Sequence, residues 1–209
     1  MFCHSSGWMS AAGVGVRSGG GAGDGSGRGS GRPVIEAYHR APVQVRDPDP
    51  RSPAVAESLG RMISDAVPGL RAEHVGSSAV PDLAGKGTID LLLPTPAEQV
   101  AEVAEALQAI GFQPQSVPRT FPDSRPMLQG VVRHRERRYR VHVHIVPDAS
   151  PEVLELRGFR DALRSDGSLR RDYEDLKRSI VARGVTNAGD FTQAKRDFII
   201  ATLRRLGFR

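Results

Sequence analysis

The stretch EHVGSSAVPDLAGKGTIDLLL, residues 73–93, predicts a strand, a corner of small residues and a second, apolar strand. The corner consists of Gly76, Ser77 and Ser78. Glycine and hydroxyl residues at such a corner leave backbone N–H groups free to face a phosphate. Asp90 lies among aliphatic residues in the second strand, where an ionised carboxylate is seldom buried without a partner or a metal. Together with Lys86, which lies between the two strands, this pattern indicates a phosphate-binding loop beside a cation site. The alternative is a helix-capping serine and a strand-end aspartate that bonds to the backbone.

Two histidines, His142 and His144, alternate with aliphatic residues in the run VHVHI at 141–145. Alternation places both imidazoles on one face of a strand. Such a pair chelates a metal, contacts a phosphate when protonated, or forms hydrogen bonds on a polar sheet face. Asp90 is the candidate third ligand if its strand is adjacent.

The composition is that of a basic protein that is able to form a core. The chain has 209 residues, 39% of them hydrophobic, a formal charge of +5 and a pI of about 10.0. This charge favours an anionic partner such as a nucleotide, RNA or polyphosphate. The single cysteine, Cys3, excludes an internal disulfide and a cysteine-based zinc site. Because no apolar run reaches about 18 residues and residues 1–31 lack a signal-like core, we expect a cytoplasmic protein without membrane contact.

Periodicity and turn signals predict the organisation of the chain. Residues 1–33 are rich in glycine and serine and are expected to be a disordered tail, which leaves one domain at 34–209. Strands are expected at 41–46, 70–75, 88–93, 112–117, 127–133 and 139–146. Helices are expected at 52–66, 97–110, 151–165, 168–183 and 190–206. The predicted fold class is therefore α/β (α+β), a mixed sheet with flanking helices and a C-terminal helical section.

Further basic residues follow the corner along the chain. Arg160, Lys177 and Lys195 lie on the predicted C-terminal helices and are candidates for the far wall of a phosphate cleft. Surface ion pairs, such as Asp161 with Arg164, are the ordinary alternative. The arginine-rich run at 133–140 predicts either a solvated turn or a surface that holds phosphates or RNA.

These motifs, taken in order, resemble the GrpB family, also called UPF0157, of the polymerase-β-like nucleotidyltransferase superfamily. The family also occurs as an extra C-terminal domain of some bacterial dephospho-CoA kinases. The matching residues are the run 74–81 and Leu83, Lys86, Ile89, Asp90, 142–144, 159–161, Leu163, Arg164, Tyr173, Leu176, Lys177, Lys195, Phe198 and Ile199. The resemblance covers nearly everything outside the tail.

The resemblance implies a nucleotidyltransferase-like fold in which the Gly-Ser corner holds nucleotide phosphates. It also implies an Asp-x-Asp or Asp-x-Glu strand and a third acid that hold two divalent ions, usually magnesium, for nucleotidyl transfer. This chain matches the first acid with Asp90, but Leu92 occupies the second position, and His142 and His144 lie where the third acid is expected. Asp82 stands where the family usually has glycine. It is either an extra metal ligand or an exposed residue of a turn.

Two interpretations follow from these departures. Either Asp90, His142 and His144 hold one divalent ion, Mg²⁺ or Mn²⁺ with Zn²⁺ as a further candidate, or the site binds a nucleotide without transferring it. In the first, Asp90 is catalytic, and the corner with the basic residues binds a nucleotide or phosphorylated small molecule. The alternative is a non-catalytic accessory module. RNA binding is a third hypothesis.

Overall fold

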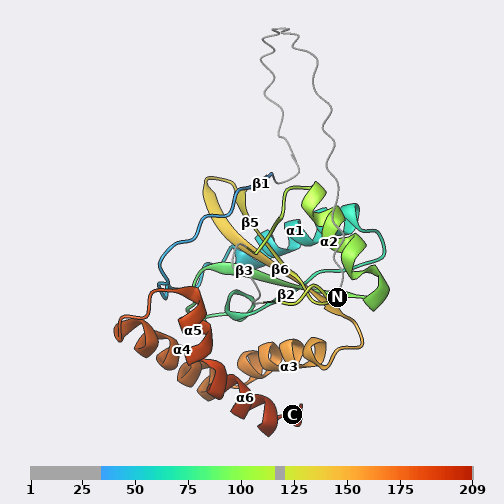
Figure 1. Ribbon diagram of the computed structural model, residues 1–209. Coiled ribbons are helices and arrows are strands. Elements are labelled where there is room, and N and C mark those ends of the chain that lie inside the picture. The colour runs from blue at the N-terminus through green and yellow to red at the C-terminus, as the bar shows by residue number, and fades with distance from the viewer. Residues whose placement is uncertain (1–33, 116–120, 209) are drawn as a thin grey trace, which may run out of the picture. The chain divides into compact units, whose positions relative to one another are not determined.

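The computed structural model describes residues 34–115 and 121–208 (Figure 1). The expected tail at 1–33 and the end of the expected strand at 112–117 lie outside the described residues. The strands are β1 (Ile35–Glu36), β2 (Glu73–Val75), β3 (Thr88–Thr95), β4 (Gln113–Pro114), β5 (Met127–His134) and β6 (Arg137–Pro147). The α-helices are α1 (Ser52–Ala66), α2 (Val100–Ala109), α3 (Pro151–Ser165), α4 (Gly167–Ala182), α5 (Ala188–Ala194) and α6 (Arg196–Arg205). Two 3₁₀ turns, Ser77–Ala79 and Ala97–Gln99, precede β3 and α2 respectively.

The strands form one mixed sheet, as the sequence predicted. Their order is β1-β5-β6-β3-β2, and β4 pairs with β5 beside this path. The central strands β3 and β6 run parallel, and the other pairs are antiparallel. The two central strands come from segments about 50 residues apart.

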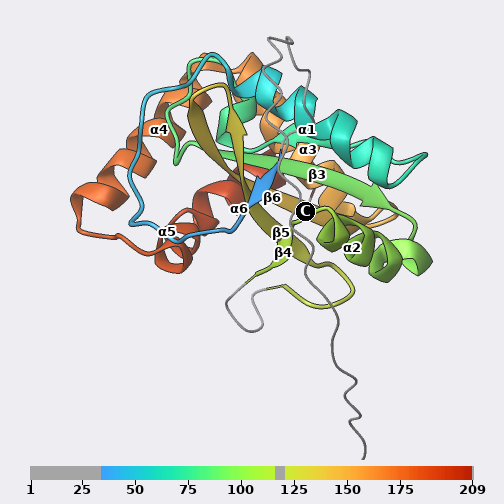
Figure 2. The same ribbon diagram turned by 90° about the horizontal axis from the view of Figure 1, so that it is seen from above.

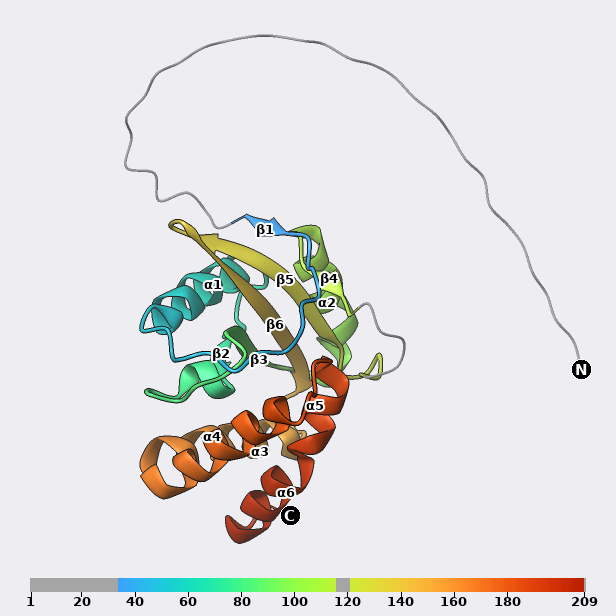
Figure 3. The ribbon, with the colours of Figure 1, turned by 90° about the vertical axis from the view of Figure 1, so that its left-hand side faces the viewer.

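Helices cover both faces of this sheet. Figure 1 shows α1 and α2 above the strands and α3 to α6 below them, and Figure 3 shows the same separation from the side. Side chains from one face of β3 and β6 pack in the main core with α1 and α2; they are Ile89, Leu91, Leu93, Val141, Val143 and Ile145. Because side chains alternate along a strand, the residues between them face the C-terminal helices.

The C-terminal helices begin where polar residues cap them. The Ser150 side chain accepts the Glu152 N–H ahead of α3, and the Asp166 side chain accepts two N–H groups at the start of α4. Both helices match the predicted ranges closely. The single helix predicted at 190–206 is instead two helices that meet at Lys195.

One predicted strand is wrong. Residues 41–46 form no ladder, and their only bridge pairs Arg46 with Gly85. The Val43 N–H bonds instead to the Thr186 carbonyl, and the Val43 side chain packs with Ile180 and Phe191. Figure 2 shows this segment passing α5 on its way from β1 to α1. Tertiary packing on the C-terminal helices therefore overrides the local β propensity.

No helix in the described ranges is long and apolar enough to cross a bilayer.

Candidate functional site

Asp90, His142 and His144 meet on one face of the sheet. Asp90 lies opposite His142 in the parallel register of β3 and β6, and Leu92 lies opposite His144. His142 Nδ1 is 3.2 Å from Asp90 Oδ1, and His144 Nε2 is 3.8 Å from the same oxygen. One ligand atom from each residue lies within 4.8 Å of the others. Adjacency of the two strands thus brings the three predicted ligands together.

The charges of this triad suit a cation. Burial alone would raise the pKa of Asp90, but the two imidazoles outweigh that effect and hold the pKa well below its ordinary value. Burial lowers the pKa of His142, although Asp90 opposes the effect. An ionised carboxylate beside a neutral imidazole offers lone pairs of both oxygen and nitrogen to a metal.

Tyr38 orients the His142 ring and was not predicted. Its hydroxyl lies 3.2 Å from His142 Nε2, so both ring nitrogens of His142 have a protein partner. When Nδ1 donates to Asp90, the tyrosine hydroxyl donates to Nε2; when Nδ1 offers its lone pair to an ion, Nε2–H donates to the hydroxyl. A ligand histidine whose second nitrogen is fixed in this way is the usual arrangement of metal sites.

Gly76 brings the small-residue corner against Asp90. Its φ is +71°, and a Cβ at this position would lie 2.6 Å from Asp90 Oδ2. Glycine therefore meets two requirements at once, a left-handed backbone and the close approach of the corner to the carboxylate.

The hydroxyl of Ser78 holds the corner to β3. It donates to the Thr88 carbonyl at 2.8 Å, so at its 3.0 Å contact it accepts from His74 Nε2. Burial lowers the pKa of His74 to about 4, which keeps the ring neutral. The hydroxyl hydrogen of Ser78 is thus used within the protein, so any contact of Ser78 with a phosphate would come from its backbone N–H.

Lysine is rare in this chain, and every lysine lies at this site. The chain has three lysines, Lys86, Lys177 and Lys195, among 29 lysines and arginines. The ammonium groups of Lys86 and Lys195 lie 5.9 Å and 4.8 Å from the centre of the Phe191 ring. Those of Lys177 and Lys195 lie 4.8 Å and 5.9 Å from the Tyr173 ring. The two rings thus link the three cations into one continuous cluster.

Lys177 differs from the other two lysines. Its side chain is buried, and its ammonium group donates to the Ala84 carbonyl and, at 3.3 Å, to Ser77 Oγ. Burial, reinforced by Lys195, lowers its pKa to about 7. Burial also lowers the pKa values of Lys86 and Lys195, which Asp90 partly offsets. Lys177 therefore fixes Ser77 and the loop, whereas Lys86 and Lys195 face the surroundings of Asp90.

The contacts of Arg160 are with β2 and with its own helix. Its guanidinium donates to Asp161 at 2.8 Å and to the His74 carbonyl at 3.2 Å, and Glu73 is 3.7 Å away. Arg164 also pairs with Asp161 at 3.4 Å. The ordinary ion-pair interpretation fits this helix face better than the predicted cleft wall.

The structure also shows where the other expected groups lie. Asp82 is exposed with φ of +60°, outside the metal-ligand group. Leu92 is fully buried against α3. In the arginine-rich hairpin, Arg137 pairs with Asp49, and Arg133 and Arg138 pair with Glu36. The hairpin arginines thus serve mainly intramolecular contacts.

Known proteins resemble this chain in sequence and in fold. The family model for the GrpB protein matches residues 42–205. A UPF0157 protein of Pseudomonas aeruginosa is 33% identical over 168 residues, which cover 78% of this chain and 67% of that protein. A dephospho-CoA kinase of Mycolicibacterium paratuberculosis is 29% identical over 79% of this chain and 46% of its own length. The crystal structure of the conserved protein GrpB from Enterococcus faecalis has a TM-score of 0.63 at 23% identity and covers 78% of this chain and 96% of that chain.

Proposed function

The chain belongs to the GrpB family, and from this premise we propose that it binds one divalent metal ion and, beside it, the phosphates of a nucleotide or phosphorylated small molecule. The observation that carries the proposal is the convergence of Asp90, His142 and His144, whose ligand atoms lie within 4.8 Å of one another.

The donor set favours a borderline metal over a hard one. Two imidazole nitrogens and one carboxylate oxygen suit Zn²⁺ best, whereas Mg²⁺ and Mn²⁺ prefer oxygen ligands. Such an ion polarises a phosphoryl oxygen when bound. The chain's own contribution is to fix the ligands, through Tyr38 on the His142 ring and Gly76 against the carboxylate.

The lysine cluster supports an anionic ligand next to that ion. Within 34–115 and 121–208, neither the ammonium group of Lys86 nor that of Lys195 has a hydrogen bond or an ion pair, and both groups lie near the Phe191 ring. The charge of Asp90 partly offsets the burial of both ammonium groups, so these lysines belong to the surroundings of the triad. A phosphate would supply the counter-charge that the fold does not provide.

Nucleotidyl transfer is the reaction class to test. A second metal lacks its usual acid, because the buried Leu92 occupies that position. The alternative is an accessory module that binds without chemistry. The similarity to part of a dephospho-CoA kinase favours this alternative.

Two measurements on the same protein samples test the proposal, each in the presence of Mn²⁺, Zn²⁺ or Mg²⁺. The first is the binding of nucleoside triphosphates, and the second is their consumption. We expect metal-dependent binding that Asp90→Ala abolishes and that Arg204→Ala retains, because Arg204 is exposed on α6. Turnover would support the transferase version. Saturable binding without turnover would support the accessory module. Equal metal-dependent binding by Asp90→Ala, or none by the unaltered protein, would contradict both versions.

A further inference from the structure

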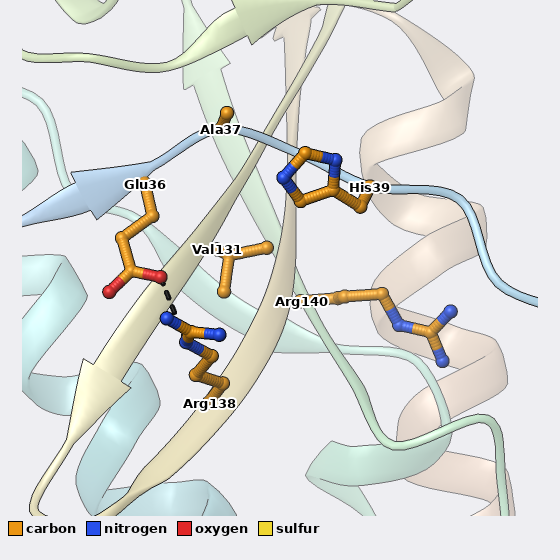
Figure 4. A pocket seen from close by; sticks show the side chains of 6 residues that line it. All are labelled: Glu36, Ala37, His39, Val131, Arg138 and Arg140. Atoms are coloured by element: carbon orange, nitrogen blue, oxygen red, sulfur yellow. Dashed lines mark ion pairs between the residues drawn. The ribbon is translucent and has the colours of Figure 1, made fainter.

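A shallow pocket of about 290 Å³ lies on the same sheet face as the triad (Figure 4). It is lined by Glu36, Ala37, His39, Val131, Arg138 and Arg140. In the sheet register Glu36 lies opposite Val131, and Val131 lies opposite Arg140. These three residues therefore form one row across β1, β5 and β6, with their side chains on one face.

The next row on this face contains the triad. Two residues further along β6, His142 lies opposite Asp90 on β3 and opposite Gln129 on β5. At a rise of about 3.3 Å per residue, the two rows are roughly 7 Å apart. The segment between Ala37 and His39 joins them, because both flanking residues line the pocket while Tyr38 contacts His142. A small molecule in the pocket would thus lie next to the metal ligands.

The pocket carries an uncompensated positive charge. At one end Arg138 is neutralised by Glu36 at 2.9 Å. At the other end Arg140 donates one hydrogen bond, to the Lys86 carbonyl at 3.1 Å, and has no acidic partner among the described residues. Figure 4 shows the His39 and Arg140 side chains at this second end, with Val131 between them and the Glu36–Arg138 pair.

An arginine and a histidine that line the same pocket can both donate hydrogen bonds to an oxyanion. A guanidinium offers several coplanar N–H donors, so Arg140 keeps most of its donors available for a phosphate or carboxylate. His39 is exposed and adds a further donor. Val131 and Ala37 supply an apolar surface between the polar ends. The volume of about 290 Å³ is close to the lower end of the range for small-molecule sites.

We propose that this pocket is a second anion site, in which Arg140 and His39 bind a phosphate or carboxylate group of a small molecule lying beside the triad. The inference goes beyond the proposed function, since it requires neither a bound metal nor the lysine cluster. It assigns the row next to the triad, on the same face of the sheet, to the binding of a second ligand group.

Backbone amide shifts during titration of the full chain with inorganic phosphate, and separately with acetate, test this site without added metal. We expect saturable shifts at Ala37, His39 and Val131. Arg140→Gln should weaken this binding roughly tenfold or more, because a charge-assisted hydrogen bond is lost. Tighter binding of phosphate would identify a phosphorylated ligand, and tighter binding of acetate a carboxylate.

Two control variants separate this site from the others. Arg204→Gln makes the same charge change on the exposed surface of α6, and Lys195→Gln alters the lysine cluster. Neither substitution should change the affinity for phosphate or acetate measured from the amide shifts of Ala37 and Val131. An unaltered amide spectrum outside the pocket would establish that Arg140→Gln remains folded. Absence of saturable shifts, shifts confined to the Phe191 region, or equal affinity of Arg140→Gln would overturn the proposal.

Discussion

The two faces of strands β3 and β6 differ in the burial and polarity of their side chains. On the face toward α1 and α2, Ile89, Leu91 and Val143 are 1% exposed or less. On the opposite face, the side chains of Asp90, His142 and His144 are 24%, 14% and 19% exposed. Because side chains alternate along a strand, neighbouring residues belong to the core and to the candidate site respectively. The comparison predicts that stability and ligand binding are separable by single substitutions.

The largest expected effect lies on the apolar face. Leu91→Ala should lower the free energy of unfolding by about 2–5 kcal/mol, because it leaves a cavity among packed side chains. Urea denaturation measures this loss. Leu154→Ala is the matched control, since Leu154 is 56% exposed, and should change stability by less than about 0.5 kcal/mol. The separation of the faces would fail if folded Leu91→Ala also lost metal affinity.

His74 is a polar exception on the apolar face, where it lies opposite Leu91. Its pKa is about 4 in the folded protein and 6.5 ordinarily, so between these values the unfolded chain binds more protons. Its contribution to stability is therefore present above pH 6.5 and is lost as the pH falls toward 4. The loss is up to about 3 kcal/mol.

His74→Gln tests this pH dependence. Denaturation between pH 4 and 7 should give a flatter stability profile for the variant than for the unaltered protein. Parallel profiles for His74→Gln and the unaltered protein would mean that His74 is not buried as a neutral ring.

A smaller effect is expected on the polar face at Tyr38. Tyr38→Phe removes the partner of His142 Nε2 and should weaken metal binding by about tenfold, the lower end of the range for such outer partners. Competition with a coloured chelator measures the change.

Tyr139→Phe is the matching variant on the other face of β6. It removes a 2.8 Å hydrogen bond to Asp49 and should lower the free energy of unfolding by about 1 kcal/mol without changing metal affinity. The reverse pattern for the two variants would contradict the assignment of the faces.

The sequence predicted the regular parts of this arrangement. A continuous apolar run identified the strand that contains Asp90. Alternation identified the strand that contains His144 and placed both histidines on one face, as the structure confirms. The helices at 52–66 and 151–165 followed from periodicity and turn signals, and each has a proline in its first turn. These features depend on local patterns, which a single sequence contains.

The features that the sequence did not predict depend on contacts between distant residues, which no local pattern encodes. Tyr38 reaches His142 across 104 residues from a segment without periodicity. The break at Lys195 interrupts a continuous apolar stripe, and the segment at 41–46 follows the packing of Val43 on Phe191. The hydroxyl of Ser78 serves the fold because His74 and Thr88 are near in space, which the Gly-Ser-Ser motif alone does not specify.

Calorimetric titration of the metal-stripped protein with Zn²⁺ and Mn²⁺ tests the central claim most directly. The account predicts one ion per folded chain and an affinity at least about 100-fold lower for Asp90→Asn, since a lost ligand should cost no less than a lost outer partner. The thermal unfolding of that variant should stay cooperative. A chain that binds neither ion saturably, or an Asp90→Asn variant that binds as tightly as the unaltered protein, would contradict it.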